Sequence, residues 1–353
     1  MPSTPPWCFS EWGDRQLAER VRLYEPDVDV ALGWLSSEPW LNSVTSGPDL
    51  STLSALATLG SIDVSIARAT EPHLDATAIL SQAEHASPRS TYAPEPGATW
   101  GVYAASPPGT TVQATSTDNP DRWTLTGRKL WCSLADRLSH ALVTAPTEDG
   151  DQRLFAIRLN DPSVQLLPAQ WQAHGLRDIS TGSIDFEQTP AAPIGGPGWY
   201  LNRPGFSWGG VAVSAVWFGA AAALAGALWR AASHRKPDQI ALMHLGRCDR
   251  LLHSALLCLR DAVAVLAPSA TSPQDAAVSA ARTRAHVADV AEEILTTVGH
   301  ALGPGPLAFD AEHIRRVSDL TLYVRQHHAE RDLARLGTLM LPDTTEDLSE
   351  RQR

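Results

Sequence analysis

Residues 123–134 hold side chains that can bind a flat organic cofactor. They read WTLTGRKLWCSL, which predicts two strands that meet at Gly127. In the second strand Lys129, Trp131 and Ser133 share one face, because side chains alternate between the two faces of a strand. An indole two residues from a hydroxyl can stack on a planar ring while the hydroxyl bonds a ring heteroatom. The alternative is that Trp131 is an ordinary core aromatic.

A histidine near the C-terminus is a candidate for proton transfer. Residues 313–337 read HIRRVSDLTLYVRQHHAERDLARLG and predict one helix. One mostly apolar stripe of that helix contains Leu320, Val324, His327, Arg331 and Ala334. An imidazole on such a stripe can move a proton, because burial shifts its pKa through neutrality. The alternatives are a core histidine with satisfied hydrogen bonds and a metal site shared with His328. Adjacent helix positions point to different faces, so we expect no metal.

Three blocks of sequence must position these residues. Residues 50–82 have apolar residues at helical spacing. Residues 99–186 consist of short β-branched and aromatic segments separated by turn signals, typical of an antiparallel barrel or sandwich. The rest is mostly helical. We therefore expect an α+β chain with an N-terminal helical domain (1–97), a middle β domain (98–188), a Pro/Gly-rich linker (189–204), a C-terminal helical bundle (205–341) and a polar tail (342–353).

One stretch is long enough to cross a membrane. Residues 211–229 carry no charge over nineteen positions. Ala and Gly dominate the stretch, and these residues contribute little to membrane insertion. Small residues on every face allow close packing instead, so we predict a central bundle helix and no membrane partner.

Composition limits the class of protein and its partners. The chain has 353 residues and a formal charge of −11 from 39 acidic and 28 basic residues. This acidity disfavours nucleic acid as a partner and favours small molecules. The four cysteines show no CxxC spacing, so we predict neither a disulfide framework nor a zinc site and expect a cytoplasmic protein. The sequence contains no GxGxxG, P-loop, HExxH or GxSxG motif.

Three segments together with this layout resemble the acyl-CoA dehydrogenase family. Residues 105–111 (ASPPGTT) are similar to the family's TEPxxGSD stretch, and residues 127–133 (GRKLWCS) to its GxKxWxT/S strand pair. Residues 175–186 begin with GLR, end with Phe186 and resemble GxRxxxxxxxxF. The resemblance implies an acyl-CoA dehydrogenase-like fold that binds FAD, with FMN as the alternative, between the β domain and a four-helix bundle. It also implies a homo-oligomer.

The same resemblance implies roles for single residues. Trp131 would stack near the flavin ring, and Ser133 would hydrogen-bond near its N5 atom. Ala105 and Thr111 would line the cofactor site. Arg235 would reach the FAD pyrophosphate of a neighbouring subunit.

The usual catalytic base of the family is missing. In most of its dehydrogenases a glutamate follows an RDxxxxxxYEG-like helix, and aligning Asp319 with that aspartate places His327 at the glutamate. The alternative glutamate position, early in the first bundle helix, falls near Gly209. Ala105 also replaces a threonine whose hydroxyl would bond the flavin.

Three functions fit this combination. The first is FAD-dependent α,β-dehydrogenation of an acyl-CoA or carrier-bound thioester, with His327 as the base and an electron acceptor as partner. The second is a monooxygenase of the same fold that uses O2 and reduced flavin from a partner reductase. The third is a non-catalytic family member that acts as an assembly partner, which the lost glutamate supports.

Overall fold

The computed structural model divides the chain into two units. It describes residues 16, 19–20, 23, 27–35, 37, 49–86, 95–119, 122–168, 171–203, 205–234, 236–267 and 272–341. The helical unit consists of Leu50–Ser61 and the described residues from 207 onward. The sheet unit consists of residues 62–206 and the described part of residues 15–49. Arg235 and the predicted polar tail lie outside the described residues, so their predicted roles are untested.

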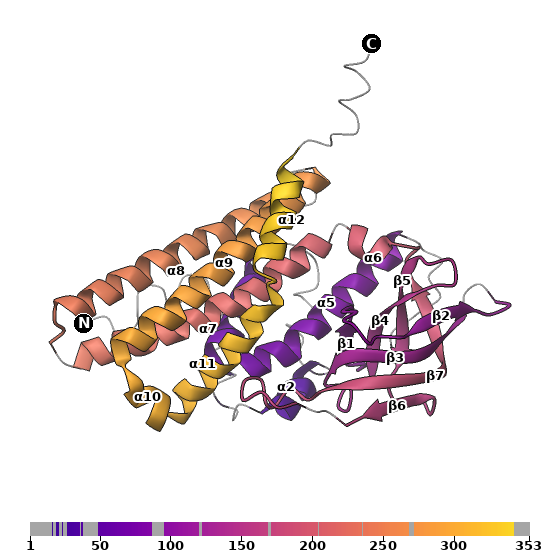
Figure 1. Cartoon of the computed structure of the whole chain (residues 1–353), viewed down its shortest axis with the longest axis horizontal. Helices are drawn as coiled ribbons and strands as arrows, with labels where there is room; N and C mark the ends of the chain where they lie inside the picture. The colour runs from indigo at the N-terminus through magenta and orange to yellow at the C-terminus, as the bar shows by residue number, and fades with distance from the viewer. Residues whose placement is uncertain are drawn as a thin grey trace, which may run out of the picture. The chain divides into compact units, whose positions relative to one another are not determined.

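Helices build the described part of the helical unit (Figure 1). They are α4 (Leu50–Ile62), α7 (Phe206–His234), α8 (Gln239–Leu266), α9 (Pro273–Leu302), α10 (Pro304–Phe309), α11 (Ala311–Tyr323) and α12 (Glu330–Met340), with a 3₁₀ turn, η2 (Val324–Gln326), before α12. Asp238, Ser272 and Asp310 cap α8, α9 and α11 by accepting backbone N–H groups of the first turn. The predicted C-terminal helices are therefore present.

Helix α7 covers the charge-free stretch. By length and composition it could cross a membrane, but 89% of its most apolar window is buried inside the structure. Such burial is expected of a core helix in a bundle. The structure therefore favours the predicted bundle helix.

Helices α4 and α7 touch through their backbones. A methyl group added at Gly219 of α7 would overlap the carbonyl oxygen of Ala57, and one added at Gly60 of α4 would overlap that of Val216. Only glycine permits so close an approach of two backbones. This contact joins residues about 160 positions apart into one core.

In its described residues, the sheet unit contains seven strands and three helices (Figure 1). They are α2 (Val28–Leu35), α5 (Val64–Ala86), β1 (Trp100–Tyr103), β2 (Gln113–Ser116), β3 (Trp123–Ser133), β4 (His140–Pro146), β5 (Gln152–Arg158), β6 (Val164–Leu167), β7 (Thr181–Ile194) and α6 (Trp199–Asn202). The strand order is β1-β4-β5-β7-β3-β2, and β6 pairs with β7. The prediction of a purely antiparallel module is wrong at one pair, because β1 and β4 run parallel.

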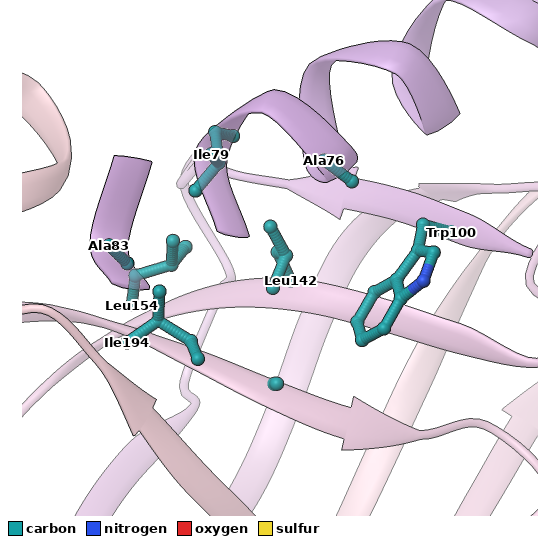
Figure 2. Packing of buried hydrophobic residues seen from close by; sticks show 8 residues of the cluster. Ala76, Ile79, Ala83, Trp100, Leu142, Leu154 and Ile194 are labelled. Atoms are coloured by element: carbon teal, nitrogen blue, oxygen red, sulfur yellow. The ribbon is translucent and has the colours of Figure 1, made fainter. Parts of the chain in front are cut away.

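The core of the sheet unit lies between α5 and the strands. Ala76, Ile79 and Ala83 of α5 face a cluster formed by Trp100, Leu142, Leu154, Ala156 and Ile194 (Figure 2). All are at most 3% exposed, and the strands β4 and β5 are buried at consecutive positions, so both of their faces are covered. The cluster fixes α5 against β1, whose next residues lead into the candidate site.

Two predicted boundaries differ from the structure. Residues 189–194 of the expected linker complete β7, and Trp199–Asn202 form α6. The β-branched and small residues there pair with β3 and β5 despite two prolines. The expected N-terminal domain, 1–97, is divided, since α4 belongs to the helical unit and α5 to the sheet unit. Asp63 separates the two helices and caps α5 by accepting the Ile66 N–H at 3.0 Å.

Candidate functional site

A β-bulge places Trp131 in an unusual position on β3. Lys129 pairs with Ile184 and Cys132 with Gly182, so three steps along β3 match two along β7. Trp131 has a φ of 61°, and its side chain is 66% exposed. Left-handed backbone costs a bulky residue about 1–2 kcal/mol. Strain of this kind concentrates at functional sites.

The bulge also corrects the predicted strand faces. Lys129, expected beside Trp131, is fully buried, whereas Trp131 is exposed. The extra residue shifts the alternation of side chains, so residues before and after it no longer follow one pattern. Trp131 is therefore not a core aromatic, and the alternative interpretation of this residue is wrong.

Trp131 and Ser133 line one pocket of the sheet unit. Arg68 and Pro72 of α5 and Tyr103 of β1 line it as well. Tyr103 donates its hydroxyl to the Ser133 carbonyl oxygen at 3.0 Å, which fixes the backbone after the bulge. The Ser133 hydroxyl lies 3.0 Å from that of Thr181, a residue outside the pocket lining. Since the Thr181 hydroxyl donates to the Ile179 carbonyl oxygen at 3.1 Å, the Ser133 hydroxyl is the donor of this pair. The pocket lining therefore combines an aromatic face, the hydroxyls of Tyr103 and Ser133 and a guanidinium.

The loop with Ala105 and Thr111 is fixed by β3. Thr111 Oγ1 accepts the Arg128 N–H at 3.0 Å, and the Thr111 N–H donates to the Arg128 carbonyl oxygen at 2.8 Å. Both side chains are exposed, and neither lines the pocket of Trp131. The structure thus joins Trp131 with Ser133 but does not add Ala105 and Thr111 to that pocket.

Lys129 anchors this loop, a role that the sequence pattern did not indicate. Its ammonium donates to the Thr144 carbonyl oxygen at 2.7 Å, to Thr144 Oγ1 at 3.0 Å and to Ser106 Oγ at 3.3 Å. Thr144 Oγ1 in turn donates to the Ala104 carbonyl oxygen at 3.0 Å. Burial lowers the pKa of Lys129 to about 8. The strand alternation put this side chain on the same face as Trp131, so no sequence signal indicated its burial.

His327 lies in a turn of the helical unit. The predicted helix 313–337 is interrupted: α11 ends at Tyr323, η2 follows, and α12 begins at Glu330. Ala329 has a φ of 45°, which a continuing helix excludes. The predicted stripe is therefore wrong beyond η2, and Arg331 and Ala334 are exposed.

His327 is nevertheless buried, at 7% exposure. Its Nε2 has no hydrogen-bond partner and lies 3.8 Å from the Asp332 carboxylate. Burial lowers the pKa of His327, and Asp332 acts against this shift. Burial raises the pKa of Asp332, but the His328 N–H and both histidines lower it more. A neutral imidazole beside a carboxylate can accept a proton.

The described residues contain no group of three or more His, Cys, Asp or Glu side chains that could hold a metal ion. His328, the second residue of the pair, is exposed and faces Asp332 at 3.6 Å. Trp131 and Ser133 belong to the sheet unit and His327 to the helical unit.

Comparison with solved structures establishes the fold as that of the acyl-CoA dehydrogenases. Butyryl-CoA dehydrogenase from Megasphaera elsdenii matches with a TM-score of 0.74 at 18% identity, over 94% of this chain and 96% of that chain. FMN-bound TdsC, the dibenzothiophene monooxygenase of Paenibacillus sp. A11-2, matches with a TM-score of 0.75 at 16% identity, over 92% and 95%.

A third structure is similar over nearly the whole chain. KijD3 in complex with FMN and a dTDP-linked amino-keto sugar has a TM-score of 0.72 at 19% identity, over 98% of this chain and 97% of that chain. No protein-family model matches the sequence, and no curated protein matches it. The predicted α+β architecture is confirmed.

Proposed function

We propose that this protein is a flavin-dependent oxidoreductase. The observation that carries the proposal is Trp131, a strained and exposed indole beside a hydroxyl-lined pocket. A strained backbone that exposes a large aromatic side chain does not stabilise the fold. It fits an indole whose role is to stack on a bound ring. The titles of the similar structures support the flavin, since TdsC and KijD3 were solved with FMN.

Residues at this pocket can contact a flavin ring that stacks on the exposed face of Trp131. The indole offers a flat apolar face, and the Ser133 hydroxyl, whose proton goes to Thr181, offers an acceptor to a polar ring atom. Arg68 adds a positive charge to the pocket lining. When bound, a flavin supplies two-electron redox chemistry. In this proposal Trp131 holds the ring plane and Ser133 orients its polar edge, for FAD or FMN.

His327 is the proposed proton-transfer residue. Its burial and lowered pKa keep the imidazole neutral at pH 7, so Nε2 is free to accept a proton. Asp332 stabilises the imidazolium that forms, because its carboxylate lies 3.8 Å away. The protein then holds that proton until it returns to product or solvent.

The similar structures favour the monooxygenase reaction over dehydrogenation. TdsC is a dibenzothiophene monooxygenase, so O2 chemistry occurs on this fold. A neutral, buried imidazole can exchange a proton with an oxygen-bound or nitrogen-bound hydrogen of the substrate. We therefore propose a reaction of O2 with reduced flavin from a partner reductase, acting on a small-molecule substrate.

Dehydrogenation of an acyl thioester is the second candidate. It is supported by the position of His327, which the family resemblance places at the usual glutamate, and by the fold shared with butyryl-CoA dehydrogenase. The family resemblance also supports a homo-oligomer. A cytoplasmic location fits Cys132, Cys248 and Cys258, which are free thiols in the described chain.

The deciding experiment begins with absorbance titrations of the purified protein with FMN and FAD. The flavin-loaded protein is then mixed anaerobically with butyryl-CoA, and separately supplied with enzymatically reduced flavin in air. Oxygen consumption above the rate of free flavin, without bleaching by the thioester, supports the monooxygenase. Bleaching supports dehydrogenation. A protein that binds neither flavin contradicts the whole proposal, and binding without either reaction favours the non-catalytic assembly partner.

A further inference from the structure

Arg284 of α9 joins two backbone segments of the helical unit. Its Nη1 donates to the Gly210 carbonyl oxygen at 3.1 Å, and its Nη2 donates to the Gln326 carbonyl oxygen at 2.8 Å. The guanidinium also lies over the Trp217 ring, 4.5 Å from its centroid. A rigid planar fork can serve both carbonyls and the aromatic face at once, which an ammonium cannot do.

The Gln326 carbonyl belongs to the turn that carries His327. The His327 N–H donates to the Val324 carbonyl oxygen at 2.9 Å and closes the 3₁₀ turn. Arg325 supplies a second link to α9 through its ion pair with Glu292. Both links precede His327 by one or two residues. Helix α9 therefore fixes the backbone from which the imidazole projects.

Charged groups from three segments act on His327. They are Asp332 of α12, Arg284 and Asp289 of α9, and the neighbouring His328. Of these four described residues, Arg284 is the one whose side chain is positively charged at every pH of interest. Its guanidinium adds to the effect of burial in lowering the pKa of His327, while the two carboxylates act in the opposite direction.

We infer that Arg284 is the positioning residue of His327: it fixes the turn that carries the imidazole and holds a permanent positive charge beside it. This inference rests on the proposed proton-transfer role of His327. Arg284 acts through the Gln326 carbonyl and through its field, so it has two separable effects. The first is geometric and needs the planar fork. The second is electrostatic and needs only the charge.

The test compares Arg284→Met, Arg284→Lys and the control Arg282→Met in the full chain. Arg282 is exposed on the same helix, so its replacement changes the net charge equally. NMR of histidine-labelled protein follows the titration of His327, assigned with His327→Gln. Amide hydrogen exchange at residue 327 reports the turn.

Each variant has its own expected result. Arg284→Met raises the titration midpoint of His327 by about half to one pH unit, because the fixed cation is gone. Arg284→Lys keeps the midpoint near that of the parent but speeds exchange at residue 327 about tenfold, because the fork is gone. Arg282→Met changes neither quantity.

An unchanged midpoint in folded Arg284→Met overturns the electrostatic effect. An unchanged hydrogen-exchange rate at residue 327 in Arg284→Lys overturns the geometric effect. If Arg284→Met does not fold, Arg284→Lys alone tests the inference. A merely structural role predicts lower stability with no change in the titration of His327. Failure of the proposed function is distinguishable, because it appears as unchanged oxygen consumption in His327→Asn while the midpoint still responds to Arg284.

Discussion

The bulge in β3 and the turn after α11 both interrupt a regular element, but the bulge exposes its side chain and the turn buries its own. The bulge turns the Trp131 indole outward to 66% exposure, at the cost of a left-handed backbone. The turn leaves His327 only 7% exposed, with an unpartnered Nε2. One interruption presents an apolar ring that cannot titrate. The other encloses a group whose protonation depends on its surroundings.

The difference separates binding from proton transfer. A stacking residue needs accessible surface, which burial would remove. A proton-transfer residue needs a controlled pKa, which burial and nearby charges supply. Substitutions in the two regions should therefore change different quantities: flavin affinity at Trp131 and turnover at His327.

The largest effect is expected at His327. His327→Asn removes the titrating group, so turnover should fall about 100-fold or more. Flavin affinity, measured by absorbance titration, should stay within about twofold because the imidazole is not placed at the stacking surface. A large loss of flavin affinity with unchanged turnover would contradict the proton-transfer role of His327.

The next effect concerns the buried ammonium beneath the bulge. Lys129 has a pKa of about 8 in the fold, against an ordinary value of 10.5. Between these pH values the unfolded chain binds a proton that the folded chain does not. The free energy of unfolding should therefore rise by about 3 kcal/mol as the pH increases from 8 to 10.5.

Denaturant unfolding at several pH values measures this slope. Lys129→Met should remove it, whereas Lys236→Met should not. Lys236 is the second of the two lysines in the sequence and is exposed, so it makes a matched control. A slope that persists in Lys129→Met contradicts the assignment.

A smaller effect is expected for Trp131→Ala. Loss of the stacking face should weaken flavin binding about 10- to 100-fold. The free energy of unfolding of the flavin-free protein should hardly change, because the side chain is exposed. Trp229→Ala, at a partly buried tryptophan of the helical unit, is the control and should leave the affinity unchanged.

The smallest effect tests the backbone strain itself. Trp131→Gly should stabilise the flavin-free protein by about 1 kcal/mol, because glycine adopts a positive φ without penalty. Thermal unfolding of the glycine and alanine variants measures the difference, since both lack the indole. If alanine proves more stable than glycine, the left-handed conformation stores no strain.

The sequence predicted elements better than their interruptions. Short strands between residues 99 and 186 were predicted, because alternation and turn residues are local signals. The predicted pair of strands meeting at Gly127 is wrong, since Trp123–Ser133 form the single strand β3. The bulge at Trp131 was not predicted, since it depends on the register with β7, about 50 residues away. The break before α12 was missed because periodicity continues through a turn that Ala329 forms with a positive φ.

The candidate site shows the same division. Trp131, Ser133 and His327 were singled out from residue type and resemblance, whereas Lys129 and Arg284 were not. Their importance comes from hydrogen bonds to carbonyl oxygens of distant segments, Thr144 and Gln326. Every residue has a backbone carbonyl oxygen, so the pattern of side chains in the sequence cannot predict which of these oxygens accepts a hydrogen bond.

The contact between α4 and α7 also affects how the chain folds during synthesis. Helix α4 leaves the ribosome roughly 150 residues before α7, whose glycine it packs against. Until then its apolar residues have no permanent cover, while the sheet unit completes its strands in between. Nucleation of the helical unit therefore has to close a very long loop, which slows folding. The apolar residues of α4 are covered only after α7 has been synthesised. Chaperones should therefore bind the chain mainly between the synthesis of α4 and that of α7.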